Sequence, residues 1–466
     1  MNGTKEKGLN ISVRSFITAI AVIFVLMCGA YVLTLLIPGG TYRRIMDAEG
    51  NLLLDTAGGF AYTEGGIPFW RWLLSPILVL GAGGSGTLIA VILFLLVIGG
   101  IFNSLEACGL MKYMLDRIAN RFGGVRYRLM AVVIFFFMAM GAMIGSFEEC
   151  VPLVPIVVAL AVNLGWDPLT GVGMSLLATG CGFASGVCNP FTVGVAQQLA
   201  GLPMFSGAWM RGLAFVLIYC LLLLFVRSYA KKIERPVNGL LGDTFMRDAR
   251  KDRALISFCS ILGAGILTVL SSAFVPALQS LTMVIVAVVF LAAGVVSCAV
   301  SGMRAGALAR SALKGIASIL PAVAMILMAS SVKYTLEEAH VLDTILYRAI
   351  NLAEILPKWA VILFIYLIVL GMNFFIPSGS AKAFMLIPLI VPMAQIFGIS
   401  TQLCVVAFAF GDGFSNVLYP TNPALLISLG LADVSYGRWF RWSWKFQGMN
   451  LLLTSALLLF GLFTGY

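Results

Sequence analysis

Long uninterrupted apolar runs are the feature that most restricts how this chain can fold. They include Ile11–Leu36, Leu88–Phe102, Gly212–Val226 and Met283–Val300. Each is long enough, or nearly so, to cross a bilayer core of about 30 Å as a helix. Because the apolar residues are continuous and do not alternate, a transmembrane barrel is excluded. Only 11% of the 466 residues are charged, whereas soluble proteins have about 25%. We therefore expect an all-α polytopic membrane protein.

The placement of charge predicts the orientation of the chain. The segment from Arg227 to Arg253 holds eight basic and four acidic residues. Cytoplasmic loops carry such an excess, so we expect this segment and the N-terminus to face the cytoplasm, in a bacterial cytoplasmic (inner) membrane. Nine crossing helices and two hairpins then place the C-terminus outside. The formal net charge of +10 is explained by these loops, and we expect the lipid bilayer, and no nucleic acid, as a partner.

Several motif classes are missing from the sequence. Its nine cysteines are scattered without a CxxC pair, which argues against a disulfide framework or a zinc site. The only histidine is His340, so neither an HExxH motif nor a His-based triad can be built. Gly83–Gly86 is not followed by the Lys-Ser/Thr of a phosphate loop. The first apolar run lacks a small-residue cleavage site and is expected to be retained. We expect no catalytic residues and no cofactor.

Two stretches of the chain look like copies of each other. Pro155 and Pro388 are 233 positions apart, and so are Asn189 and Asn422. Each half holds a polar tip inside apolar sequence and then an Asn-Pro break, a pattern that indicates the binding site of a secondary transporter. Because the second half has one extra helix, we expect it to be inverted in the membrane relative to the first half.

This repeat predicts the domain organisation. Each half should contain a re-entrant hairpin and a broken helix, and re-entrant segments are tolerated only beside protein or a water-filled cavity. In chain order, the predicted segments are a first inverted repeat over 1–227 (hairpin about 129–163, broken helix about 169–200), a cytoplasmic basic linker over 228–253, and a second inverted repeat over 254–466 (hairpin about 359–396, broken helix about 401–431).

The two Asn-Pro breaks supply the first candidate binding residues. Proline removes a backbone donor and disfavours helical geometry in the residue before it. The half-helix that follows should start with free N–H groups, which together with the helix dipole favour a carboxylate. The candidates are Asn189, Pro190 and Thr192 in the first half and Thr421 and Asn422 in the second. A proline kink without a ligand is the alternative.

The hairpin tips and one aspartate complete the candidate site. Acids at membrane depth are costly, so Glu148 and Glu149 should face a cavity or a partner such as Lys382. Asp412 lies in the second broken helix and either belongs to the site or forms a structural salt bridge with Lys382 or Lys333. A further alternative is that the tips reach the headgroups, where their charges are solvated. The remaining tip candidates are Ser146, Ser378, Gly379 and Ser380.

At these paired stretches the chain resembles the YfcC/DcuC-type carriers of the ion transporter superfamily. The resemblance rests on Ser146–Glu149, Cys188–Val193, Pro377–Ser380 and Thr421–Pro423. It implies a homodimer in which a transport part, with both hairpins and both broken helices, moves like an elevator against a scaffold part. It also implies that two amphipathic surface helices serve as arms, expected at Met111–Phe122 and Thr335–Leu352.

The resemblance leaves two substrate classes, because the YfcC branch is described as candidate basic amino acid antiporters and the DcuC branch carries C4-dicarboxylates. Three acids against Lys382 favour a substrate with both a carboxylate and a cationic group. We therefore expect exchange or ion-coupled transport of a basic amino acid of the arginine, ornithine or lysine type. The alternative is a Na+- or H+-coupled C4-dicarboxylate carrier, and more remotely a channel or an intramembrane enzyme. The superfamily's sodium symporters carry Ser-Asn-Thr signatures at these tips, and this chain departs from them.

Overall fold

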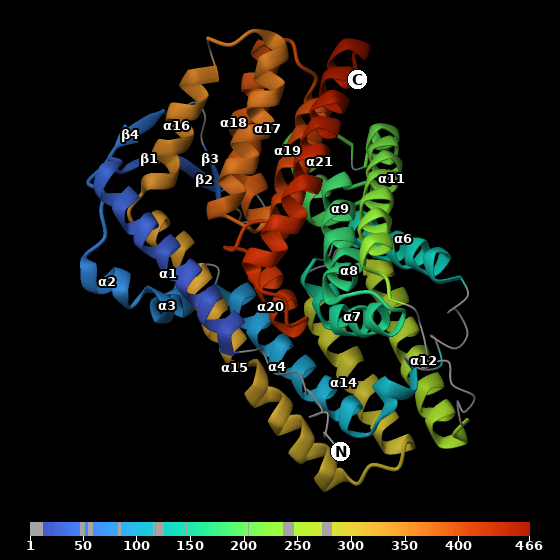
Figure 1. The fold of residues 1–466 in the computed structure, drawn as a ribbon. Coiled ribbons are helices and arrows are strands. Elements are labelled where there is room, and N and C mark those ends of the chain that lie inside the picture. The colour runs from blue at the N-terminus through green and yellow to red at the C-terminus, as the bar shows by residue number, and fades with distance from the viewer. Residues whose placement is uncertain are drawn as a thin grey trace.

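The computed structural model describes residues 13–46, 52–54, 59–82, 85–114, 117, 125–145, 147–203, 205–235, 247–272, 282–353 and 355–466. Within these ranges the chain is mostly helical, and its helices pack as two groups (Figure 1). The first group occupies the left and the bottom of Figure 1. Its elements are α1 (Val13–Leu36), α2 (Phe69–Leu73), α3 (Ser75–Leu78), η1 (Val79–Gly81), α4 (Ser85–Ala107), α12 (Ala249–Ser272), α14 (Thr282–Val300) and α15 (Ala305–Glu338).

The second group occupies the upper right of Figure 1 and contains both broken helices. From the first half of the chain it takes α6 (Arg126–Ile144), η3 (Glu148–Leu153), α7 (Val154–Asn163), α8 (Pro168–Val172), η4 (Gly173–Leu177), α9 (Ala178–Ser185), η5 (Pro190–Gly194), α10 (Val195–Leu199) and α11 (Ala208–Ile233). From the second half it takes α17 (Lys358–Phe375), α18 (Gly379–Ile396), α19 (Thr401–Gly413), η6 (Phe414–Val417), α20 (Pro423–Leu431) and α21 (Tyr436–Thr464).

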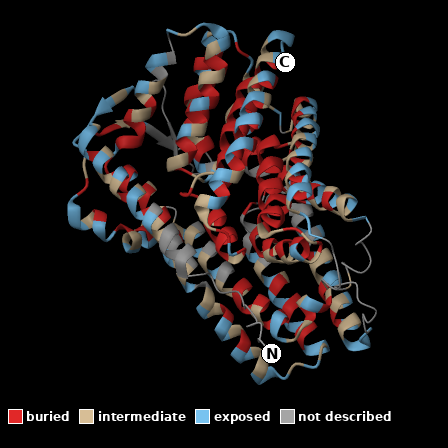
Figure 2. Cartoon of the chain, viewed as in Figure 1, coloured by how far each residue is buried: buried red, intermediate tan, exposed pale blue. Residues whose placement is uncertain are grey.

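The most deeply buried part of the molecule lies in this second group (Figure 2). Every residue of α9 is buried, and so is every residue of α19 from Leu403 onward. The two helices pack against each other, and close approach is possible because Gly413 lies against the backbone of Ala184. A side chain at position 413 would overlap Ala184, so the crossing depends on glycine.

The prediction of an all-α chain is wrong in one segment. Strand β1 (Gly40–Tyr42) pairs antiparallel with β4 (Phe60–Tyr62), and β2 (Arg44–Met46) pairs antiparallel with β3 (Leu52–Leu54). Aromatic packing holds the first pair, since Phe60 stacks on Tyr347 with a centroid separation of 4.2 Å. Such short strands depend on tertiary contacts for their stability, and for this reason the sequence pattern did not predict them.

The surface helix expected over Thr335–Leu352 is also corrected. Helix α15 continues to Glu338, the chain turns at His340 with a φ of 55°, and α16 (Val341–Ala353) then begins. Asp343 is buried and accepts a hydrogen bond from the backbone N–H of Tyr42 at 3.1 Å. Burial, followed by the charge of Asp343, raises the pKa of Tyr42 to about 12. Most of the other expected arm, Met111–Phe122, lies outside the described residues.

Counting only residues whose side chains are described, four helices are long and apolar enough to cross a bilayer. They are Arg126–Met143 within α6, together with α11, α17 and α21. The described stretches of several other apolar helices are shorter, and the chain is a multi-pass membrane protein by this composition. Arg126–Met143 and α17 contain the segments expected as the first legs of the hairpins, which begin at about residues 129 and 359. Each has 18 residues and rises about 27 Å, so the re-entrant path and the count of nine crossings stay predictions.

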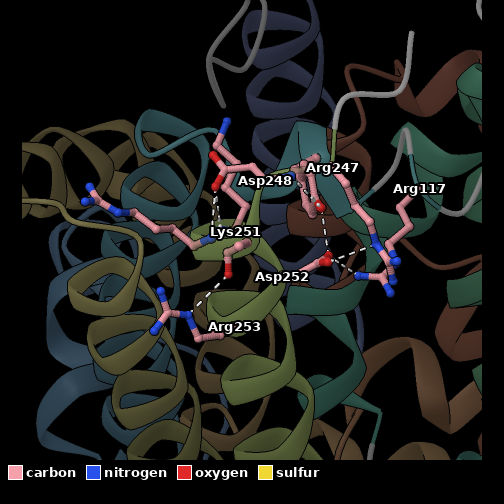
Figure 3. Close-up of polar contacts among 9 residues, drawn as sticks. Arg117, Arg247, Asp248, Lys251, Asp252 and Arg253 are labelled. Atoms are coloured by element: carbon pink, nitrogen blue, oxygen red, sulfur yellow. Dashed lines mark hydrogen bonds and ion pairs between the residues drawn. The ribbon is translucent and has the colours of Figure 1, made fainter. Parts of the chain in front are cut away.

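A cluster of charged side chains joins the start of α12 to the segment that follows α4 (Figure 3). Asp252 Oδ1 accepts a hydrogen bond from the Tyr113 hydroxyl at 2.7 Å and pairs with Arg117. Asp252 Oδ2 lies 3.2 Å from Arg247 Nε. Asp248 stabilises the first turn of α12 by accepting a hydrogen bond from the backbone N–H of Arg250 at 2.9 Å. We refer to Tyr113, Arg117, Arg247 and Asp252 as the Asp252 cluster.

Candidate functional site

Both predicted broken helices are interrupted at their Asn-Pro dipeptides. Helix α9 ends at Ser185 and is followed by Gly186, whose φ of 50° is left-handed, and the chain resumes in a helical conformation at Pro190. Helix α19 continues into η6, which ends at Val417, and α20 starts at Pro423. We call residues 186–189 break 1 and residues 418–422 break 2. Break 1 is held against α6, because Cys188 donates its backbone N–H to the carbonyl of Ala142 at 3.0 Å.

The expectation of free N–H groups after the breaks is wrong for α20. Asn422 Oδ1 accepts from the backbone N–H of Ala424 at 2.9 Å and of Leu425 at 3.4 Å. Asn189 Oδ1 likewise accepts from the backbone N–H of Thr192 at 3.2 Å. Asparagine is among the best N-cap residues, so the side chain that marks each break also satisfies the donors beyond it. A carboxylate would have to displace the cap to bind there.

The charged residues of the second half form a buried pair. Lys382 Nζ lies 2.6 Å from Asp412 Oδ1, and both side chains are 0% exposed. The same ammonium donates to Asn373 Oδ1 at the end of α17. The ion pair of Asp412 is therefore made with Lys382 and not with Lys333. Lys333 Nζ instead lies 3.3 Å from Glu337 Oε1, and both side chains are partly exposed on α15.

Amide and hydroxyl side chains extend this pair to break 2. Asn373 Nδ2 donates to Ser415 Oγ at 2.6 Å and to Asn416 Oδ1 at 3.0 Å. Asn422 Nδ2 donates to the same Asn416 oxygen at 3.0 Å. A continuous set of hydrogen bonds thus runs from the ammonium of Lys382 to the residue that caps α20. We call these six residues the Lys382 network: Lys382, Asp412, Asn373, Ser415, Asn416 and Asn422.

Residues of the first half meet this network at Gly379, the first residue of α18. A Cβ at position 379 would overlap the Thr192 methyl and lie 2.6 Å from Asp412 Oδ2. Gly379 thus lies between Thr192 of the first broken helix and Asp412 of the second. Both Asp412 Oδ2 and Thr192 Oγ1 are buried, and neither has a hydrogen-bond partner among the described atoms.

The chain turns that join the helix pairs contact the opposite halves of the molecule. We call residues 145–153, between α6 and α7, tip 1, and residues 376–378, between α17 and α18, tip 2. Element η3 of tip 1 packs against α20, which follows break 2. Helix α18, which follows tip 2, packs against η5 and α10, which follow break 1. Each turn region therefore meets the half-helix that follows the break of the other half.

The predicted site residues fall into three sets in the structure. Ser378 is exposed, whereas six candidates are buried or half-buried around the two breaks: Asn189, Thr192, Gly379, Lys382, Asp412 and Asn422. Thr421 is also buried, and its hydroxyl has no partner among the described atoms. The remaining candidates lie outside the description, namely Ser146 as a whole and the side chains of Glu148, Glu149, Pro190 and Ser380.

Sequence reasoning missed three members of the network, Asn373, Ser415 and Asn416. All three are buried. A signal was present, because both asparagines are amides within apolar helical sequence, Asn373 in α17 and Asn416 in the second broken helix. Polar side chains at such positions face protein partners. No group of three or more His, Cys, Asp or Glu gathers within the described ranges, so the residues seen there form no metal centre of that kind.

Comparison with protein families and curated proteins gives two kinds of match. The family model of the C4-dicarboxylate anaerobic carriers (DcuC) matches residues 16–463. A protein of Escherichia coli (strain K12) named "Putative basic amino acid antiporter YfcC" is 29% identical over 409 residues, which are 82% of this chain and 79% of that protein. An uncharacterised protein of Haemophilus influenzae is 25% identical over 394 residues, 80% and 76% of the two chains.

Solved structures show more distant likenesses. The YdaH transporter of Alcanivorax borkumensis has a TM-score of 0.46 at 18% identity, over 97% of this chain and 99% of that one. MtrF of Neisseria gonorrhoeae, described with a class of antimetabolite efflux pumps, has a TM-score of 0.45 at 15% identity, over 96% and 95%. Both TM-scores lie below 0.5.

Proposed function

Because this chain belongs to the C4-dicarboxylate anaerobic carrier family, we propose that it is a secondary active transporter of a small carboxylate-bearing metabolite. The observation that carries the proposal is the Lys382 network at the meeting of the two broken helices. Ionisable residues inside a membrane are costly, and they mark substrate and ion pathways. Lys382 and Asp412 are fully buried and tie α18 to α19 beside residues of the first half.

A basic amino acid is the first substrate class to test. Asp412 Oδ2 and Thr192 Oγ1 lie on either side of Gly379 and have no hydrogen-bond partner among the described atoms. As two acceptors, they suit an amino group of a substrate. The charge of Asp412 is already balanced by Lys382. The acids that remain for a second cationic group are Glu148 and Glu149 of tip 1. The substrate carboxylate would compete with Asn422 for the N–H groups of α20.

A C4-dicarboxylate is the second candidate, and Arg211 favours it. This arginine, in the first turn of α11, is fully buried and donates to the carbonyls of Ser206 at 3.0 Å and Val187 at 3.3 Å. Within the described residues it has no acidic partner. A buried guanidinium normally pairs with a carboxylate, often through two parallel hydrogen bonds. Val187 belongs to break 1, so an anionic ligand there would lie beside the first Asn-Pro.

The proposed transport cycle follows from the way the two halves meet. The cross-packing of η3 with α20 and of α18 with η5 and α10 supports two inverted repeats that carry a single site between them. We propose that the second helix group moves as an elevator against the first, in a homodimer. Exchange, or coupling to Na+ or H+, would drive the movement. The proposed orientation in a bacterial inner membrane has the N-terminus inside and the C-terminus outside.

Transport by purified protein in proteoliposomes tests this function. We expect uptake of labelled arginine, lysine or ornithine that saturates and shows counterflow, because a carrier exposes its site to one side at a time. If succinate alone is taken up, and Arg211→Gln abolishes that uptake, the substrate is a C4-dicarboxylate and not a basic amino acid. Flux without saturation or counterflow would indicate a channel and would exclude a carrier.

A further inference from the structure

The surroundings of the Lys382 ammonium resemble those of a bound inorganic cation. Its nitrogen contacts a carboxylate oxygen of Asp412 at 2.6 Å and the amide oxygen of Asn373. Carboxylate and amide oxygens are the ligands that hard metal cations take in proteins. Lysine supplies three donors and no acceptor, so the ammonium presents the same positive charge to these oxygens that a monovalent metal ion would.

The hydrogen bonds around the ammonium depend on a cation at this point. Because the Asn373 oxygen faces Lys382, its amide nitrogen faces Ser415 and Asn416. The Asn416 oxygen also accepts from Asn422, the residue that caps α20. Without a positive charge, Asp412 would be a buried anion with no partner among the described residues, which is strongly unfavourable. One cation therefore fixes the relative positions of α17, α18, α19 and break 2.

We infer that the Lys382 ammonium is a tethered cation that takes the place of a sodium ion between α18 and α19, so that this protein transports its substrate without sodium. The inference rests on the proposed function for its statement about transport. Its statement about the structure stands on the contacts of Lys382, Asn373 and Asp412 alone. A purely structural ion pair would hold the same helices together. After removal of the lysine, however, the vacated site beside Asp412 would then not bind small cations selectively.

Thermal unfolding of the purified full-length protein tests the structural statement. The midpoint Tm of the unmodified protein should be the same in sodium, potassium and choline chloride at equal ionic strength. In Lys382→Ala the Tm should fall, and it should then rise with sodium or propylammonium until it saturates, because each can occupy the vacated place. The matched control is Lys333→Ala, because the partner of Lys333, Glu337, is partly exposed. The Tm of this control variant should respond to neither cation.

Each outcome of this experiment decides the question. A sodium-specific rise in the Tm of the unmodified protein would overturn the inference, and so would a folded Lys382→Ala protein whose Tm responds to no cation. Lys382→Ala combined with Asp412→Asn should lose the cation response, because the anion is gone. If neither variant folds, the unmodified protein still decides, since its Tm in sodium, potassium and choline needs no variant.

Uptake measurements in proteoliposomes distinguish a failure of this inference from a failure of the proposed function. If the protein carries its substrate, uptake into proteoliposomes should be unchanged when choline replaces sodium, and an inward sodium gradient should not drive accumulation. Accumulation driven by sodium would overturn the tethered cation while leaving the transporter intact. Absence of any transport would overturn the proposed function, and the unfolding results would still judge the cation site.

Discussion

The Lys382 network and the Asp252 cluster use the same kinds of charged side chain in opposite surroundings. Lys382 and Asp412 are 0% exposed, whereas Arg117 and Arg247 are 36% and 73% exposed around Asp252. Salt and water screen exposed pairs, which therefore contribute little to stability. A buried pair excludes water, and its large desolvation cost is repaid only while both partners are present.

The two clusters therefore respond differently to the loss of one partner. The Asp252 cluster holds a surface segment against α12, and water can replace any one of its contacts. In the Lys382 network water cannot replace a lost contact, because the members are buried and are hydrogen-bonded to one another. Buried charges are weak evidence for stability as such. Their position at the meeting of two broken helices favours a functional role.

The largest effect is expected from removing one buried charge. Lys382→Met should destabilise the protein by about 3–5 kcal/mol, because Asp412 would remain as an unpaired buried anion. The matched control Lys333→Met should change stability by roughly 0.3–0.5 kcal/mol, as expected for an exposed pair four residues apart on a helix. Thermal and denaturant unfolding in detergent measure both. Equal shifts for the two lysines would contradict the distinction between buried and exposed pairs.

The second effect concerns the close approach at Gly379. Gly379→Ala introduces a Cβ that overlaps the Thr192 methyl and lies 2.6 Å from Asp412 Oδ2. We expect a destabilisation of about 1–3 kcal/mol from overpacking and a large loss of uptake. Gly371→Ala in α17 is the control, since nothing lies within 4 Å of its added Cβ. Because alanine favours a helix, that control should be as stable as the parent or more so.

A smaller effect is expected from the asparagine that caps α20. Asn422→Ala removes the acceptor of two backbone donors, which should cost about 0.5–2 kcal/mol, and it also breaks the contact with Asn416. The control Ser400→Ala removes the cap of α19, where Ser400 Oγ accepts from Leu403 at 3.1 Å. Stability should fall in both variants, whereas uptake should fall only in Asn422→Ala. Normal uptake by Asn422→Ala would place break 2 outside the site.

The smallest effect should come from the Asp252 cluster. The hydrogen bond from Tyr113, followed by the charges of Arg117 and Arg247, holds the pKa of the Asp252 carboxyl below its usual 3.8. A lowered folded-state pKa stabilises the fold above the unfolded-state pKa, and this contribution is lost as pH falls through the folded-state pKa. Asp252→Asn should therefore lower Tm slightly at neutral pH, and the difference from the parent should vanish in strong acid. High salt should shrink the difference, and a salt-independent one would contradict the exposed character of the cluster.

Local features of the chain were predictable from its residues. The second broken helix was expected at about 401–431, and α19 begins at Thr401 while α20 ends at Leu431. Proline and glycine impose their backbone geometry on their immediate neighbours, so the breaks could be found without a fold. The polar tips within apolar sequence were visible for the same reason. The strands between Gly40 and Tyr62 were not, because such short strands depend on tertiary contacts, here of β1 with α16 and of β3 with α18.

The partners of the polar side chains could not be predicted in the same way. Each Asn-Pro indicated an anion site, yet Asn422 occupies the donors of α20 with its own side chain. That outcome depends on the rotamer that the surrounding protein selects, and the residue sequence does not specify it. Asn373 and Asn416 are polar residues in apolar helices like many others. They join one network because the fold brings α17 and η6 together.

Residue type and order alone predict that this chain forms apolar membrane helices with two polar interruptions, since hydrophobicity and backbone geometry are properties of neighbouring residues. The fold is needed to know that Asp412 pairs with Lys382, 30 positions away, and not with Lys333. Both lysines are equally basic in the sequence. Coulomb attraction acts over a few ångströms in a dry interior, and the packing of α18 against α19 is what brings one of them within that distance.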